Sequence, residues 1–139
     1  QPTQPLRQPK HITQAISLLQ ESVADSVVSV VELQRTHSPE FVCVVSPSGL
    51  LFPWDDEATA GRIDWQPPLR QAVRPTYIRD GTCYAFRRAT VGKHRNIYGP
   101  DVRALIIPPE ETCALDEMED WYRAERLLRE REAKAAEEA

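Results

Sequence analysis

Long apolar runs, paired cysteines and glycine-rich phosphate loops are all missing from this sequence of 139 residues. Its apolar runs are far shorter than the roughly 20 residues that a membrane-spanning helix needs, and its first residues do not resemble a signal peptide. We therefore expect a soluble, cytoplasmic protein with no membrane partner. The phosphate-binding patterns Gly-x-x-x-x-Gly-Lys-Ser/Thr and Gly-x-Gly-x-x-Gly do not occur either.

The three cysteines, Cys43, Cys83 and Cys113, lie far apart, and no histidine stands at ligand spacing from them. This spacing argues against a zinc site and against a disulfide framework, and favours small buried residues on strands. The 21 acidic and 17 basic side chains give a net charge of -4, which excludes general coating of nucleic acids. With 41% apolar residues, the chain can form one compact core.

Helical and strand patterns alternate in the first half of the chain. Apolar residues recur at steps of three and four from Pro9 to Val23, which predicts an amphipathic helix. The segment Ser26–Glu32 is apolar on both alternating faces and predicts a strand covered on both sides, so the fold class is α/β. Residues 41–45 and 50–52 flank Ser-Pro-Ser-Gly and predict a hairpin. The proline-rich stretch from Pro53 to Pro75 is expected to be an excursion from the core.

The second half predicts two more buried strands and two helices. Strands are expected at 82–86, after a tight turn at Asp80-Gly81, and at 102–107. A short helix is expected over 88–98, ending near Gly99. Asp116 can cap a last helix, whose end beyond Leu128 has no large apolar residue and is expected to be a solvated helix or a fraying tail.

Two groups of charged residues could hold ligands. One is basic and could bind a carboxylate or phosphate through guanidinium groups, although solvated arginines at strand ends explain it as well. The other is acidic and could hold Mg²⁺, although helix N-termini attract acids in any case. The basic group is Arg70, Arg74, Arg79, Arg87, Arg88, Lys93, Arg95 and Arg103, and the acidic group is Glu110, Glu111, Asp116, Glu117, Glu119 and Asp120.

Five motifs follow one another along almost the whole chain. They are Gln1-Pro-Thr-Gln-Pro-Leu-Arg7, Ala24-Asp-Ser-Val-Val-Ser-Val-Val31, Arg70-Gln71 with Tyr77-Ile-Arg-Asp-Gly-Thr-Cys-Tyr84, Asn96-Ile-Tyr-Gly99, and Thr112-Cys-Ala-Leu-Asp-Glu-Met-Glu-Asp-Trp121. In this order they resemble the motifs of the acylneuraminate cytidylyltransferases, the CMP-sialic acid synthetases. The order makes the resemblance more specific than any one motif.

The resemblance implies a three-layer, mostly parallel, Rossmann-like sheet of the nucleotide-diphospho-sugar transferase type, incomplete in this chain, with a protruding hairpin or arm. Residues 1–128 would form the partial cytidylyltransferase domain, with the arm at roughly 36–75, and residues 129–139 a charged helical tail. Family members open with a strand and a nucleotide-binding loop that nothing before Gln1 resembles. Because the chain starts inside a motif and without methionine, we expect it to represent roughly the second half of such an enzyme and to be inactive alone.

The resemblance also implies a reaction and its participants. A nine-carbon sugar acid would attack the α-phosphorus of CTP through its anomeric hydroxyl, pyrophosphate would leave, and Mg²⁺ would offset the negative charge. Gln1 would hydrogen-bond the sugar, Tyr84 would line its pocket, and Arg70 would pair with its carboxylate. In the family that arginine lies on an arm that reaches a neighbouring subunit, so a homodimer with shared sites is implied. Asp116 corresponds to the second aspartate of the metal pair and is the expected catalytic metal ligand.

Three positions depart from the family pattern. Ala114 replaces the first metal aspartate, which should weaken Mg²⁺ binding. Asp80 replaces the usual asparagine at the sugar site, where it would repel an acidic sugar unless an arginine such as Arg79 screens it. Gln4 replaces a serine. Two alternatives therefore stay open: a non-catalytic remnant or dimerisation module of the same fold, and a small anion-binding domain unrelated to sugar activation.

Overall fold

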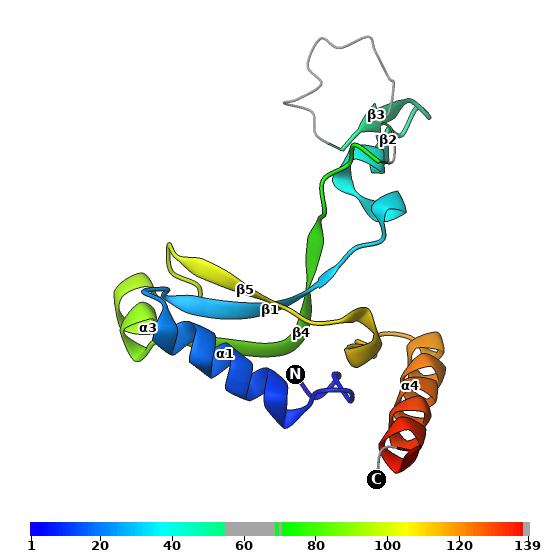
Figure 1. Cartoon of the computed structure of the whole chain (residues 1–139). Coiled ribbons are helices and arrows are strands. Elements are labelled where there is room, and N and C mark those ends of the chain that lie inside the picture. Colours follow the sequence, from blue (N-terminus) through cyan, green and yellow to red (C-terminus); the bar gives the residue numbers. More distant parts are fainter. Residues whose placement is uncertain (55–68, 70, 138–139) are drawn as a thin grey trace. The chain divides into compact units, whose positions relative to one another are not determined.

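The computed structural model describes residues 1–54, 69 and 71–137 (Figure 1). The chain divides into two compact units. The first comprises Gln1–Val31 together with Ile78–Ala139, and the second comprises Glu32–Tyr77. Among the described helices, none combines the length and the apolar character that crossing a membrane requires.

The first unit contains a three-stranded sheet with the strand order β4-β1-β5. The strands are β1 (Ser26–Glu32), β4 (Tyr77–Phe86) and β5 (Val102–Ile106). β1 and β5 are parallel, with Ser26 opposite Val102. β4 runs antiparallel to β1, because Arg87 N donates to Asp25 O near one end and Cys83 N to the hydroxyl of Ser29 further along. The fold is therefore α/β, but in the described residues the sheet is mixed rather than mostly parallel.

Helix α1 (Pro9–Glu21) begins at a proline, as the sequence predicts, and its two ends are held by side chains. At its start, Gln8 N donates to Nδ1 of His11, which is 1% exposed. At its end, the guanidinium of Arg87 donates to the carbonyls of Leu19, Ser22 and Ala24 at 2.6, 2.8 and 2.9 Å. These bonds satisfy carbonyls that a helix end leaves without partners.

The tight turn predicted at Asp80-Gly81 is wrong, because both residues lie inside β4. The strand continues from Tyr77 to Phe86, and Gly81 lies inside it with a φ of 76°. A positive φ inside a strand is typical of a bulge, and glycine accepts it without a steric penalty. An Asp-Gly pair therefore produced a local distortion of one strand instead of a reversal between two.

The helices after β4 differ from the prediction at their ends. Helix α3 (Arg88–His94) ends earlier than expected, where Arg95 takes a left-handed conformation and its N–H donates to Val91 O. Helix α4 (Met118–Glu137) begins after Asp116, so the predicted cap at Asp116 is wrong. Asp120 replaces it, because one of its carboxylate oxygens accepts the backbone N–H groups of residues 116 and 117 at 3.0 and 2.9 Å.

One hydrophobic cluster of the first unit lies between the first loop and α4. Buried Leu6, Cys113 and Ala124 form it, and Leu115, Leu127 and Leu128 pack against it. Further buried apolar residues of this unit lie on α1, on β1 and after β5, among them Ala15, Val27 and Ile107. β5 was expected to be buried, but Val102 and Ile106 are 44% and 55% exposed. The cysteines also vary, since Cys113 is buried outside any strand, Cys83 is half-buried and Cys43 is exposed.

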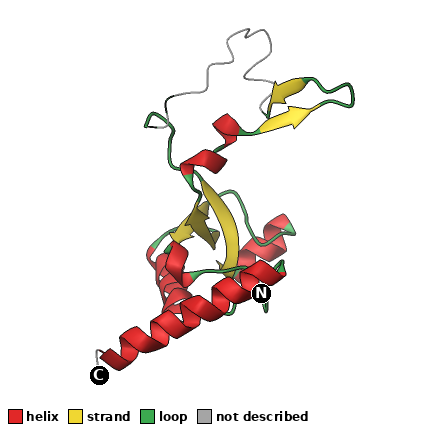
Figure 2. Ribbon diagram, turned by 90° about the vertical axis from the view of Figure 1, so that its right-hand side faces the viewer, coloured by secondary structure: helices red, strands yellow, loops and turns green. Residues whose placement is uncertain are grey.

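The second unit contains the predicted hairpin, drawn as a pair of yellow strands in Figure 2. Its strands are β2 (Cys43–Val45) and β3 (Leu51–Pro53), which pair antiparallel. The 3-10 helices η1 (Arg35–His37) and η2 (Pro39–Phe41) precede them. The hairpin prediction is thus confirmed, whereas its role in an arm stays a prediction.

Candidate functional site

The first loop lies along β4 and is fixed to it by three donors. They are the backbone nitrogen of Gln1, the side-chain amide of Gln4 and the guanidinium of Arg7, which donate to the carbonyls of Gly81 (3.4 Å), Asp80 and Thr82 (3.3 Å) respectively. Gln4, at 2% exposed, is almost completely buried, which gives the departure from serine a structural role. An irregular loop is thereby held in register against a strand about 80 residues further along the chain.

Gly81 allows Gln1 to lie directly against the strand. A Cβ atom at this position would stand 2.4 Å from Oε1 of Gln1, far inside van der Waals contact. The φ of 76° independently disfavours any residue with a side chain. The φ therefore favours glycine at position 81, while the end of the flexible Gln1 side chain could turn away from an added Cβ atom.

Asp80 is a structural carboxylate at this site. It is 8% exposed, and it accepts hydrogen bonds from the backbone N–H of Thr82 at 3.2 Å and from the hydroxyls of Thr82 and Thr112. Burial raises the pKa of Asp80, but hydrogen bonds from Ser29, Thr82 and Thr112 outweigh burial and hold the pKa below its usual value. The carboxylate therefore stays ionised at neutral pH and is directed at protein donors.

The predicted screening of Asp80 by Arg79 is not what the described contacts show. The guanidinium of Arg79 donates to the hydroxyl of Tyr98 at 2.8 Å, while hydroxyl groups surround the carboxylate of Asp80. Neighbours in a strand point to opposite faces, so these two side chains separate. Neutral donors thus stabilise the charge of Asp80.

A third segment, residues 112–116, joins the loop and the strand. The Thr112 hydroxyl bonds Asp80 at 2.7 Å, and Leu115 N donates to Thr3 O at 2.9 Å. Ala114 and Asp116 flank Leu115, so both lie on a segment fixed to the first loop. The structure therefore brings the segments that carry Gln1, Asp80 and Asp116 together.

Asp116 offers one exposed carboxylate at the end of this segment. Mg²⁺ commonly takes one or two protein carboxylates and completes its shell with substrate phosphates and water. A lone Asp116 fits that mode, whereas Ala114 supplies no oxygen ligand from its side chain. Within residues 1–54, 69 and 71–137, no three His, Cys, Asp or Glu side chains gather closely enough to hold a metal ion.

Two predicted site residues are not joined to this cluster. Tyr84 lies half-buried on β4, four residues and therefore about 13 Å along the strand from Asp80. Arg70 lies outside the described residues. Its predicted pairing with a sugar carboxylate stays a prediction.

Much of the remaining predicted charge is used within the fold. Glu111 accepts Lys10 at 2.6 Å and pairs with Nε2 of His11 at 2.8 Å. Burial raises the pKa of Glu111, but the hydrogen bonds and charges of Lys10 and His11 outweigh burial, so the pKa lies below its usual value. Arg103 pairs with Asp101 at 2.7 Å. Glu111 and Arg103 are therefore bonded to other side chains of the protein, which is neither a helix cap nor simple solvation.

Sequence reasoning missed the hydroxyls around Asp80. Thr82, two residues away, could have been found, because an aspartate often accepts the N–H two residues further on. Ser29 and Thr112 carry no such signal, since only the tertiary structure brings them to this carboxylate.

Comparisons with known proteins add no family to this geometry. A scan against models of known protein families and a search of curated proteins both found no match for the chain.

Proposed function

We propose that this chain carries the sugar-acid part of a cytidylyltransferase, which transfers CMP from CTP to an acidic nine-carbon sugar and releases pyrophosphate. The observation that carries the proposal is the convergence of three segments far apart in sequence. The first loop contacts residues 80–82 of β4 and residue 115, and β4 contacts residue 112. These segments belong to three of the five motifs that carry the resemblance.

The direction of the strands supports the same location. In α/β folds, ligands bind beyond the carboxyl ends of parallel strands. Segment 107–116 directly follows the carboxyl end of β5, and it is bonded to both the first loop and β4. We take the sheet β4-β1-β5 to be part of a larger, three-layer, Rossmann-like sheet of the nucleotide-diphospho-sugar transferase type.

Each proposed role is a matter of binding and orientation. Gln1 would hydrogen-bond the sugar hydroxyls, Tyr84 would line the sugar pocket and Arg70, from the partner in a homodimer, would bind the carboxylate through two parallel hydrogen bonds. Asp116 would hold Mg²⁺, which when bound would offset the negative charge of the phosphates. Asp80 is assigned no direct contact with the sugar, because its carboxylate is already bonded to protein donors.

Binding and turnover test the proposal separately. Calorimetry of residues 1–139 with N-acetylneuraminate, legionaminate and pseudaminate should detect binding of one sugar acid. Gln1→Ala and Arg70→Ala should each weaken that binding about tenfold, as expected for a lost hydrogen bond to a charged or polar ligand. Arg88→Ala provides the matched control, because Arg88 is exposed and lies outside the proposed site.

Turnover is measured as pyrophosphate release with CTP and Mg²⁺, with residues encoded upstream of Gln1 included where the gene has them. Release that depends on the sugar acid supports the enzyme. Sugar-acid binding without any release favours the alternative, a non-catalytic remnant of the same fold. Absence of both binding and release contradicts the proposal.

A further inference from the structure

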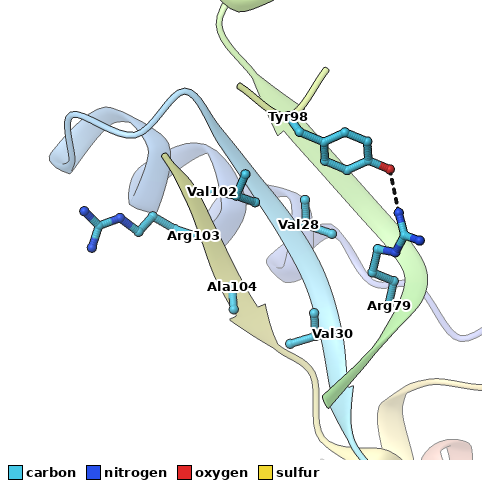
Figure 3. Close-up of a pocket in the computed structure, with 7 residues that line it drawn as sticks. All are labelled: Val28, Val30, Arg79, Tyr98, Val102, Arg103 and Ala104. Atoms are coloured by element: carbon cyan, nitrogen blue, oxygen red, sulfur yellow. Dashed lines mark hydrogen bonds between the residues drawn. The ribbon is translucent and has the colours of Figure 1, made fainter. Parts of the chain in front are cut away.

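A hollow of about 330 Å³ lies on the sheet of the first unit, away from the contacts of the first loop (Figure 3). Its floor consists of Val28 and Val30 from β1 with Val102 and Ala104 from β5. Strand register explains this floor, because Ala104 is opposite Val28 and Val102 stands two residues earlier on the same face. Val102 is 44% exposed, so part of the apolar floor is open to solvent.

Arg79 and Tyr98 border the floor. One guanidinium nitrogen of Arg79 donates to the Tyr98 hydroxyl at 2.8 Å, and the guanidinium carbon lies 5.8 Å from the centre of the ring. This contact orients the arginine but uses only one of its five N–H donors. Among the residues that the structure describes, no carboxylate pairs with Arg79.

Arg103 also lines the hollow but is already neutralised. Both its Nε and one terminal nitrogen bond the carboxylate of Asp101, at 2.7 and 3.0 Å. Figure 3 shows its side chain pointing away from Arg79 and Tyr98. Within the part of the chain that the structure describes, Arg79 is therefore an oriented cation without an acid partner, beside an apolar floor.

We propose that this hollow binds a small monocarboxylate with an apolar body. The carboxylate would accept hydrogen bonds from the free donors of Arg79, and the apolar body would cover the valines. Charge complementarity carries the assignment, since Arg79 is held in place by Tyr98 and has no acid partner among residues 1–54, 69 and 71–137, and a guanidinium favours a planar anion. A volume of about 330 Å³ lies at the small end of the range of ligand pockets, which fits a small molecule.

This site is separate from the proposed sugar site. Asp80 and Arg79 are neighbours on β4, but Asp80 is bonded to Thr112 and Arg79 to Tyr98. The ligand would thus occupy the opposite face of the strand from the first-loop contacts. Failure of cytidylyl transfer would not affect this proposal, whereas a further layer of helices over this face, as the three-layer sheet of the proposed function implies, would close the hollow.

Methyl NMR of the full chain tests the proposal directly. Hydrocinnamate is the probe, and its neutral amide, hydrocinnamamide, is the matched ligand without charge. Hydrocinnamate should shift the methyl signals of Val28, Val30, Val102 and Ala104 at millimolar concentrations. The amide should bind at least about tenfold more weakly, since it lacks the charge-assisted hydrogen bonds.

The two arginines of the hollow provide paired variants. Arg79→Met should raise the Kd for hydrocinnamate about tenfold and leave that for the amide unchanged, whereas Arg103→Met should change neither by more than about twofold. Unfolding curves check that both exposed substitutions preserve the fold. Equal binding of acid and amide, shifts confined to other methyls, or no shifts at all would overturn the proposal. So would sedimentation showing that hydrocinnamate shifts these methyls only by dissociating a dimer, because the face would then belong to a second copy.

Discussion

Removal of the Asp80 carboxylate should destabilise the protein strongly, whereas asparagine at the same position should be tolerated. In Asp80→Ala, Thr112 can still donate to Oε1 of Gln4 at 3.3 Å, but the N–H and hydroxyl of Thr82 and the hydroxyl of Ser29 lose their acceptor. Leaving three buried donors without an acceptor costs at least about 3 kcal/mol in the free energy of unfolding. In Asp80→Asn the amide oxygen can keep the bond from the N–H of Thr82, so we expect a loss of about 1 kcal/mol.

The acid dependence identifies the charge as the cause. Because the pKa of Asp80 is lowered in the fold, its contribution to stability is fully present above the unfolded pKa, about 4, and is lost as pH falls through the folded pKa. The stability gap between the native protein and Asp80→Asn should therefore close below about pH 4. Comparison of these two proteins cancels the acid response of the other carboxylates.

Urea unfolding followed by circular dichroism, from pH 7 down to pH 3, measures both quantities. A loss under about 1 kcal/mol for Asp80→Ala would refute the argument from unsatisfied donors. A gap between native protein and Asp80→Asn that stays constant across the same pH range would refute the argument from charge.

Three further substitutions test other parts of the structure. Gly81→Ala should cost about 2 kcal/mol because of its positive φ, measured by urea unfolding, and should turn the Gln1 side chain away, measured by loss of sugar-acid affinity; an unchanged stability would contradict the strain. Arg87→Ala should cost about 1–2 kcal/mol by removing donors at the end of α1, whereas Arg88→Ala should stay within about 0.5 kcal/mol; equal losses would deny that role. Ala114→Asp should tighten Mg²⁺ about tenfold by calorimetry, and an unchanged affinity would place the metal elsewhere.

Elements whose pattern is local were predicted well from the sequence. The strand Ser26–Glu32 is observed with the predicted bounds, and α1 begins at the predicted proline. The hairpin around Gly49, whose φ is 85°, follows from its turn residues. In each case the signal and the structure depend on residues within a few positions of one another.

Features that depend on distant residues were predicted poorly. The pair Asp80-Gly81 locally favours a chain reversal, but β4 continues through it. Thr112 and the first loop, both distant in sequence, bond to the strand at these two residues. The exposure of β5 was not foreseen, because an apolar run does not reveal what packs on it. For the candidate site, the sequence identified Gln1 and Asp116 on segments that do meet, but not that Asp80 would be bonded within the protein.

The bonds of the first loop span unusually long stretches of chain. Gln4 and Arg7 bond residues 76 and 75 positions away, and Gln4 also accepts from Thr112, 108 positions away. Loop closure over such distances is entropically costly and slow, so contacts of this kind form late in folding. During synthesis, residues 1–7 must wait for residues 80–112 to leave the ribosome before these partners are present.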